Sequence, residues 1–200
     1  MSKKQNGDFL FNFISPVYGL FYNSQKEKYQ ESLNLAKAKF DFSQFETIID
    51  VGCGTGALCS VLNQLDLKVT GVDPAKRMLR IGEKKKENEK VNFVLGGTST
   101  KLPFEDNSFD VSIASYVAHG LKKAERLKLY AEMSRISKKY VVLYDYNDKR
   151  GFFTSIIEWA ERGDYFNFIK TVKNELDEHF KSFEMIDVDV RASLYICKVK

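Results

Sequence analysis

The chain has 200 residues and a net charge of +4, from 31 lysines and arginines against 27 aspartates and glutamates. Hydrophobic residues make up 44% and charged residues 29%, a composition typical of a globular protein, and so small a basic excess gives no argument for a nucleic-acid partner. No apolar run approaches the length of a membrane span and no secretory signal is evident, so we expect a cytoplasmic protein. Three cysteines without a Cys-x-x-Cys spacing or a nearby histidine pair predict neither disulfides nor a metal site.

Residues 1–45 are predicted to form a helical N-terminal extension. Ser15 and Pro16 have the residue types of an N-cap and a first helical position, which predicts a short aromatic helix ending near Tyr22. Apolar side chains at helical spacing predict a second helix over residues 25–40.

Residues 46–146 alternate between strand and helix patterns, which predicts βαβ units and a parallel sheet covered on both faces. The expected strands are 47–51, 68–72, 91–95, 110–115 and 140–144, and the expected helices are 57–65, 75–87 and 121–136. Strands as apolar as "TIIDV" and "YVVLY" are typical of positions buried on both sides of such a sheet.

Residues 147–200 are predicted to supply substrate-side helices and a terminal hairpin. Helices are expected at 151–161 and 164–180, followed by strands at 185–190 and 193–199. The two strands are separated by only two residues, which predicts an antiparallel pair. The whole chain is therefore expected to form one α/β domain, Rossmann-like, with a mostly parallel seven-stranded sheet.

Three glycines, Gly52, Gly54 and Gly56, directly follow the first strand. Such a turn lets backbone N–H groups approach a ligand closely, and the pattern also satisfies the dinucleotide fingerprint. Asp73, at the end of the second strand, suits ribose hydroxyls in either class of cofactor. Three details disfavour a dinucleotide: Asp50 suits an ammonium group and would repel a pyrophosphate, Gly56 falls one place early, and residues 96–110 have no counterpart in the fingerprint.

The motifs "DVGCGTG", "GVDPAKRML" and "LPFEDNSFD", in this order and spacing, closely resemble those of the class I S-adenosylmethionine-dependent methyltransferases. The nearest resemblance is to the small-molecule branch grouped with the ubiquinone and menaquinone C-methyltransferases. It covers residues 9–109 well and the remainder in order of elements only. It implies a single methyltransferase domain over residues 1–200 and S-adenosyl-L-methionine as cofactor.

The resemblance also implies which residues contact the cofactor. The backbone of the glycine loop packs against it, Asp50 orders that loop or holds the methionine amine, and Asp73 accepts the ribose hydroxyls. Tyr18 is expected nearest to it, in an aromatic lid formed by the N-terminal extension. The full set of expected cofactor-binding residues is Tyr18, Asp50, Gly52, Cys53, Gly54, Asp73, Pro74, Met78, Thr98, Ser99 and Ser115.

One position departs from the family pattern. Members commonly carry an acidic residue four positions before the leucine of Leu-Pro-Phe, where it accepts a hydrogen bond from the adenine amine, and this chain has Thr98 there. A neutral hydrogen bond is about half as strong as a charge-assisted one. We therefore expect the cofactor to bind with softened adenine selectivity, with the backbone of Thr98 and Ser99 sharing the contact.

The segment after the fourth strand is expected near the transferable methyl, because ligands bind outside the carboxyl ends of such strands. His119 is a candidate general base there, and a structural histidine at a helix start is the alternative. Aromatic residues gather in the N-terminal extension and again over residues 152–168, which suggests a small apolar or aromatic methyl acceptor, although most of these rings could equally be core.

Two other functions stay open on the sequence alone. The chain could bind S-adenosylmethionine or S-adenosylhomocysteine without catalysis, as a regulatory protein, because Thr98 departs from the pattern and no unambiguous base is present. A nicotinamide-dependent oxidoreductase is disfavoured, since 200 residues leave little room for a second nucleotide-binding half and a catalytic domain. The acceptor atom and the oligomeric state are not predicted.

Overall fold

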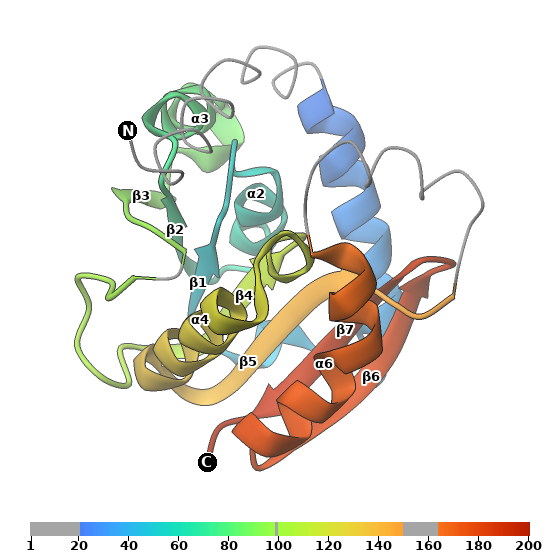
Figure 1. The fold of residues 1–200 in the computed structure, drawn as a ribbon. Coiled ribbons are helices and arrows are strands. Elements are labelled where there is room, and N and C mark those ends of the chain that lie inside the picture. The colour runs from blue at the N-terminus through green and yellow to red at the C-terminus, as the bar shows by residue number, and fades with distance from the viewer. Residues whose placement is uncertain (1–20, 99, 150–163) are drawn as a thin grey trace.

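A computed structural model describes residues 21–98, 100–149 and 164–200, and its centre is one seven-stranded sheet (Figure 1). The strand order is β3-β2-β1-β4-β5-β7-β6. The strands are β1 (Thr47–Val51), β2 (Lys68–Asp73), β3 (Asn92–Leu95), β4 (Phe109–Ser115), β5 (Ser137–Tyr146), β6 (Ser182–Asp189) and β7 (Ala192–Lys198).

The first five strands and β6 run in one direction, and β7 runs against them between β5 and β6. β1 pairs with β2 and β4, which places it at the centre of the parallel part, and β7 pairs antiparallel with both β5 and β6. The predicted fold class, a mostly parallel Rossmann-like sheet with a terminal hairpin, is confirmed. All five parallel strands end at the same edge of the sheet, and the residues at that edge form the candidate site described below.

Helices cover both faces of the sheet and create two cores. On one face, a helix over residues 21–36 and α2 (Ala57–Asn63) bury Leu33, Leu58 and Leu62 against the sheet. On the other face, α4 (Lys123–Ile136) and α6 (Tyr165–His179) bury Leu129 and Phe168 (Figure 1). A strand buried on both sides needs apolar residues at every position, which explains the unbroken runs in the sequence.

Several element boundaries differ from the sequence prediction. Residues 21–36 form continuous helix, without the expected break between Tyr22 and Gln25. α3 (Lys76–Glu83) stops four residues short of the predicted Glu87. There the carbonyl of Gly82 accepts the N–H of Lys85, three residues on, and the buried side chain of Asn88. β5 and β6 each begin three residues earlier than expected. The first 20 residues of the predicted N-terminal lid and extension (1–45) and the predicted helix at 151–161 lie outside the described residues.

Candidate cofactor and acceptor site

All three loop glycines lie in the left-handed region of backbone space. The φ angle is +87° at Gly52, +54° at Gly54 and +74° at Gly56. The N–H groups of Gly52 and Cys53 both donate to the carbonyl of Val72, which fastens the loop to the end of β2. Because glycine adopts these angles at little steric cost, the sequence itself produces the sharp turn between β1 and α2.

The space around the loop differs from one glycine to the next. A Cβ atom at Gly52 would lie 2.5 Å from Cγ2 of Val117 and 3.3 Å from Cγ2 of Thr98. A Cβ atom at Gly54 would meet no atom of the described residues within 4 Å. Gly52 therefore permits close packing against the segments that follow β3 and β4, whereas the backbone at Gly54 faces open space where a ligand can approach.

Asp73 ends β2 with its carboxylate turned towards this loop. Its Oδ2 atom accepts the N–H of Gly54 at 2.9 Å and its Oδ1 atom accepts the N–H of Ala75 at 2.7 Å. The carboxylate thus connects the glycine loop to the turn that precedes α3. Pro74 is half-buried after it, and Met78 is buried in the first turn of α3.

Asp50, the penultimate residue of β1, is a buried acid with an unsatisfied oxygen. Its side chain is 1% exposed, and Oδ2 accepts a weak hydrogen bond from the Cys59 thiol at 3.5 Å. Its Oδ1 atom has no hydrogen-bond partner among the described residues. Burial raises the pKa of Asp50 to about 7, the hydrogen bond from Cys59 opposes this rise, and the charge of Asp73 adds to it. A cationic ligand group would satisfy this oxygen and favour its ionised form.

The segment that follows β3 also reaches the glycine loop. The N–H of Gly96 donates to the carbonyl of Asp73 at 3.2 Å, and the half-buried Thr98 approaches Gly52. Two further residues of the predicted cofactor set, Tyr18 and Ser99, lie outside the described residues, as do Phe9, Phe11 and Phe13 of the predicted lid. Its last two aromatic residues lie in the helix over residues 21–36, where Phe21 is exposed and Tyr22 is buried.

Two hydroxyl pairs connect the helix over residues 21–36 to the carboxyl ends of the central strands. The Ser115 hydroxyl at the end of β4 lies 2.8 Å from that of Tyr29, and the Ser32 hydroxyl lies 2.8 Å from that of Tyr144 in β5. Sequence analysis included Tyr29 only as part of the helix predicted over residues 25–40. No local pattern indicates that its hydroxyl is bound, because its partner is 86 positions away.

His119 forms a pair with a buried aspartate that sequence analysis missed. It lies in a 3-10 turn, η3 (Ala118–Gly120), directly after β4. Its Nδ1 atom is 2.8 Å from Oδ1 of Asp145, and its backbone N–H donates to Oδ2 of the same carboxylate at 3.2 Å. Asp145 is fully buried near the end of β5, and its Oδ1 also accepts the N–H of Tyr146. The rule that ligands bind at the carboxyl ends of parallel strands could have singled out Asp145.

Tyrosine rings surround the imidazole of His119. The ring centroids of Tyr146, Tyr116 and Tyr165 lie 4.8, 6.4 and 6.5 Å from its own. Tyr116 has φ of +53°, a left-handed conformation that is strained for a bulky residue and is most often found at functional sites. Of the second aromatic cluster predicted from the sequence, Phe168 is instead core, and residues 152–159 lie outside the described residues.

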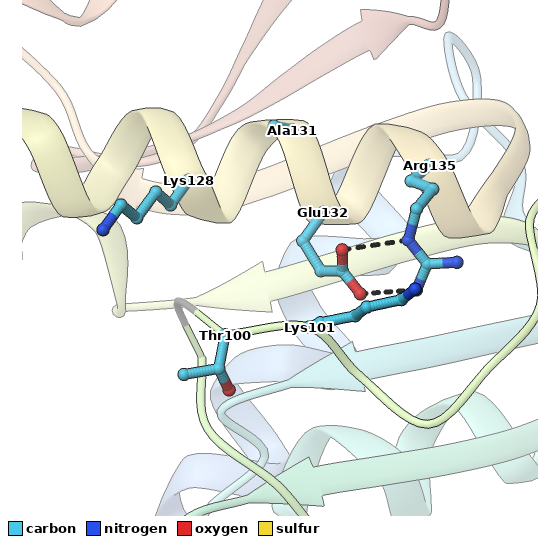
Figure 2. A pocket seen from close by; sticks show the side chains of 6 residues that line it. All are labelled: Thr100, Lys101, Lys128, Ala131, Glu132 and Arg135. Atoms are coloured by element: carbon cyan, nitrogen blue, oxygen red, sulfur yellow. Dashed lines mark hydrogen bonds and ion pairs between the residues drawn. The ribbon is translucent and has the colours of Figure 1, made fainter.

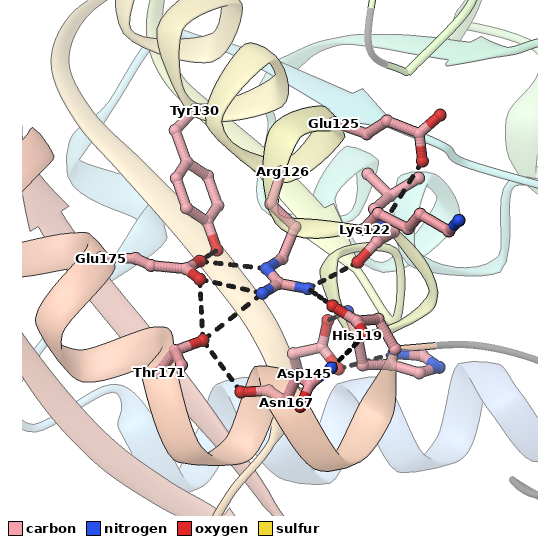
Figure 3. A network of polar contacts seen from close by, with 11 residues as sticks. His119, Lys122, Glu125, Arg126, Tyr130, Asp145, Asn167, Thr171 and Glu175 are labelled. Carbon is pink, nitrogen blue, oxygen red and sulfur yellow. Dashed lines mark hydrogen bonds and ion pairs between the residues drawn. The ribbon is translucent and has the colours of Figure 1, made fainter.

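A buried arginine ties the His119 turn to α4 and α6 (Figure 3). Arg126 makes a two-point ion pair with Glu175, at 3.0 and 2.9 Å, and donates to Asp164 and to the carbonyl of Leu121. The N–H of Asp164 in turn donates to the carbonyl of His119 at 3.1 Å. Sequence analysis gave no sign of this network, since Arg126 occupies an ordinary position in a charged helix.

A surface hollow of about 340 Å³ beside α4 is separate from this arrangement (Figure 2). Two of its four charged side chains are committed to each other, because Glu132 pairs with Arg135 at 2.6 Å, and Glu132 also accepts the N–H of Leu102. None of the residues that line it belongs to the glycine loop or to the His119 pair. The lining residues are Thr100, Lys101, Lys128, Ala131, Glu132 and Arg135.

Metal-ligating and membrane-spanning features were also sought. Among residues 21–98, 100–149 and 164–200, no three His, Cys, Asp or Glu side chains gather closely enough to hold a metal ion. Within the same ranges, every helix is too short or too polar to cross a membrane. Cys53, Cys59 and Cys197 are buried thiols.

The central part of the chain matches a known family. Residues 49–144 match the family model described as a methyltransferase domain, and this range lies inside the predicted cofactor-binding core. A sterol 4-C-methyltransferase of Caenorhabditis elegans is 32% identical over 143 residues, which is 68% of this chain and 41% of that protein. A demethylmenaquinone methyltransferase of Renibacterium salmoninarum is 34% identical over 46% of this chain and 37% of its own. The chain thus spans about two fifths of the length of these relatives.

Solved structures share the fold. A Thermotoga maritima protein, described as an S-adenosylmethionine-dependent methyltransferase and possible histamine N-methyltransferase, superposes with a TM-score of 0.70. The match covers 96% of this chain and 99% of that one at 17% sequence identity. At that identity the likeness concerns the fold alone.

Proposed function

Because residues 49–144 match a methyltransferase domain and the chain belongs to the class I S-adenosylmethionine-dependent methyltransferases, we propose that it transfers a methyl group from S-adenosyl-L-methionine to a small apolar or aromatic molecule. The cofactor supplies an electrophilic methyl group. The protein therefore has mainly to align the acceptor and exclude water.

The observation that carries this proposal is the unsatisfied oxygen of Asp50 beneath the glycine loop. A buried carboxylate oxygen without a partner is costly, and the ammonium group of the methionine end would complete it. Asp73, at the end of β2 beside the glycine loop, suits the ribose hydroxyls. The backbone of Gly52, Cys53 and Gly54 would pack against the cofactor between these two acids.

The proposed roles of the other residues follow the same arrangement. Pro74 and Met78 would flank the adenine, with Thr98 and Ser99 on its amine edge and Tyr18 in the lid. Ser115 would lie towards the acceptor. The acceptor's apolar or aromatic character is supported by the tyrosine rings around His119 and by the names of the sterol and menaquinone relatives.

Calorimetric titration with S-adenosylmethionine and with S-adenosylhomocysteine tests the proposal. We expect micromolar binding of both, lost in Asp73→Ala and retained in Asp148→Asn, a surface control whose carboxylate pairs with Lys173. Absence of binding by the folded wild-type protein would overturn the proposal. Binding without methyl transfer to any compound in a metabolite extract would instead indicate a non-catalytic regulatory protein.

The proposed cellular location is the cytoplasm. Buried, unpaired thiols such as Cys53, Cys59 and Cys197 suit a reducing compartment.

A further inference from the structure

We propose that His119 and Asp145 form a general-base pair, and that the methyl acceptor is a small aromatic compound whose hydroxyl group gives its proton to His119. This inference rests on the proposed function and names its substrate class.

The contacts of Asp145 fix the position of the proton on the imidazole. The carboxylate is fully buried and receives the backbone N–H groups of His119 and Tyr146 as well as the His119 ring. A carboxylate accepts hydrogen bonds and has none to donate, so Nδ1 must carry a proton at its distance of 2.8 Å. In the neutral ring the lone pair is therefore on Nε2, which is the form that a general base requires.

The surroundings of the imidazole favour chemistry over a purely structural role. One backbone hydrogen bond to Asp145 would be enough to hold the turn, yet the ring is aligned with the same carboxylate as well. The side chain of His119 is 15% exposed, so protons can pass on to solvent. Two residues before it, Val117 packs over Gly52, which connects this turn directly to the cofactor loop.

The groups that face His119 come from each element packed around it. Asp145 and Tyr146 come from β5, Tyr116 from the end of β4, and Tyr165 from α6. Asp145 is the one carboxylate of the described residues in contact with the ring, so it stabilises the imidazolium that forms when the base takes a proton. The tyrosine rings give the neighbouring space an aromatic lining, which suits an aromatic acceptor.

Whether a general base is needed depends on the atom of the acceptor that attacks the methyl group. An amine attacks with a lone pair it already has, whereas a hydroxyl is a weak nucleophile until it loses its proton. The O–H proton moves to Nε2 of His119, and the oxygen forms its bond to the methyl carbon. The carbon–sulfur bond of the cofactor breaks with its electron pair left on sulfur, and the imidazolium then releases the proton to solvent.

The first test reads the tautomer of His119 without any ligand. The chain has two histidines, so a long-range proton–nitrogen NMR spectrum shows two imidazoles, and His119→Gln assigns them. At pH 8 we expect His119 with its proton on Nδ1. Asp145→Asn should shift this towards Nε2, because an amide can donate to Nδ1, while Asp148→Asn should leave it unchanged. A wild-type His119 protonated on Nε2 would overturn the pair.

The second test uses para-substituted phenols, from 4-methoxyphenol to 4-nitrophenol, with S-adenosylmethionine. For 4-methoxyphenol we expect His119→Gln to lower kcat/KM by about 10²–10⁴-fold. The loss should shrink towards 4-nitrophenol, which is already largely ionised at pH 8, and the dissociation constant of S-adenosylmethionine should not change. An equal loss for every phenol, or no loss, would overturn the role of His119.

These results also separate this inference from the proposed function. If S-adenosylmethionine binds but no phenol in the series is methylated, the acceptor class is wrong and the methyltransferase proposal stands. If S-adenosylmethionine fails to bind, the proposed function fails whatever the tautomer of His119. Urea unfolding of both His119→Gln and Asp145→Asn checks that each variant is folded, and either variant alone is enough to test the pair.

Discussion

Asp50 is expected to lower the stability of the ligand-free protein at neutral pH, so Asp50→Asn should stabilise it. Burial raises the pKa of Asp50 from its ordinary value of 3.8 to about 7. A carboxyl with a raised folded-state pKa binds its proton more tightly in the folded protein than in the unfolded chain. Its stabilising contribution is fully present below pH 4 and is lost as the pH rises through 7.

The size of the effect follows from the shift. One pKa unit corresponds to about 1.4 kcal/mol of stability, and the pKa of Asp50 is raised by roughly three units. Between pH 5 and pH 8 the wild-type protein loses the stabilisation that corresponds to roughly two of these units, or about 3 kcal/mol. An asparagine does not titrate. The free energy of unfolding of Asp50→Asn, relative to wild type, should therefore increase by about this amount across the interval.

Urea unfolding at pH 5 and at pH 8 measures the difference, and Asp110→Asn is a matched control. Asp110 is also buried, which alone would raise its pKa, but backbone N–H groups of Glu46 and Thr47 together with nearby lysines hold its pKa below the usual value. Its contribution is lost only in more acidic solution, so Asp110→Asn should be destabilised equally at both pH values. A difference between Asp50→Asn and wild type that is the same at pH 5 and pH 8 would refute the reasoning.

The same proton should compete with the cofactor. If the methionine ammonium pairs with ionised Asp50, only the free protein in which Asp50 is ionised can bind the ligand. That fraction is about a tenth at pH 6 and about nine tenths at pH 8. Binding of S-adenosylhomocysteine should then tighten about tenfold between these pH values in the wild type. The Asp50→Asn protein should bind S-adenosylhomocysteine weakly at both pH values. A variant that is more stable but has lost affinity for the ligand shows the trade-off between stability and function expected at a binding site.

Three further changes test other parts of the structure. Gly52→Ala should lower the free energy of unfolding by about 1–3 kcal/mol more than Gly54→Ala, because its Cβ atom would overlap a neighbouring side chain, and urea unfolding compares the two. Thr98→Asp should tighten S-adenosylmethionine binding several-fold by calorimetry if the adenine amine is its partner, and unchanged or weaker affinity would contradict that role. Arg126→Met should cost about 3–5 kcal/mol by leaving Glu175 buried and unpaired, and a second change, Glu175→Leu, should recover most of the loss in thermal unfolding.

The sequence was sufficient to predict the fold because the parallel strands are buried on both faces. Their apolar runs, and the glycines after the first of them, are local signals that need no knowledge of the rest of the chain. Boundaries that depend on distant contacts were missed. Just past the end of α3, the carbonyl of Gly82 accepts the side chain of Asn88, six residues further on, and no helix propensity encodes that contact.

The site was predictable where it follows a strand end and unpredictable where it depends on side-chain partners. Asp73 and the glycine loop follow directly from their positions in the chain, and His119 was identified as a candidate. Its partner Asp145 is 26 residues away, and the link exists because β4 and β5 are neighbours in the sheet. Arg126 was missed altogether, because burial of a charge is a property of the folded molecule.

Left-handed Tyr116 and the tight approach of Val117 to Gly52 both lie at the carboxyl edge of the parallel strands, and the contacts of the His119 turn explain how they persist. Left-handed Tyr116 and the packing of Val117 against Gly52 would both relax if this turn could move. Separate elements hold it: Asp145 of β5 binds the backbone N–H of His119, and the N–H of Asp164, before α6, binds its carbonyl. These two bonds hold the backbone of the turn from both sides, so contacts within the protein itself position the imidazole of the base.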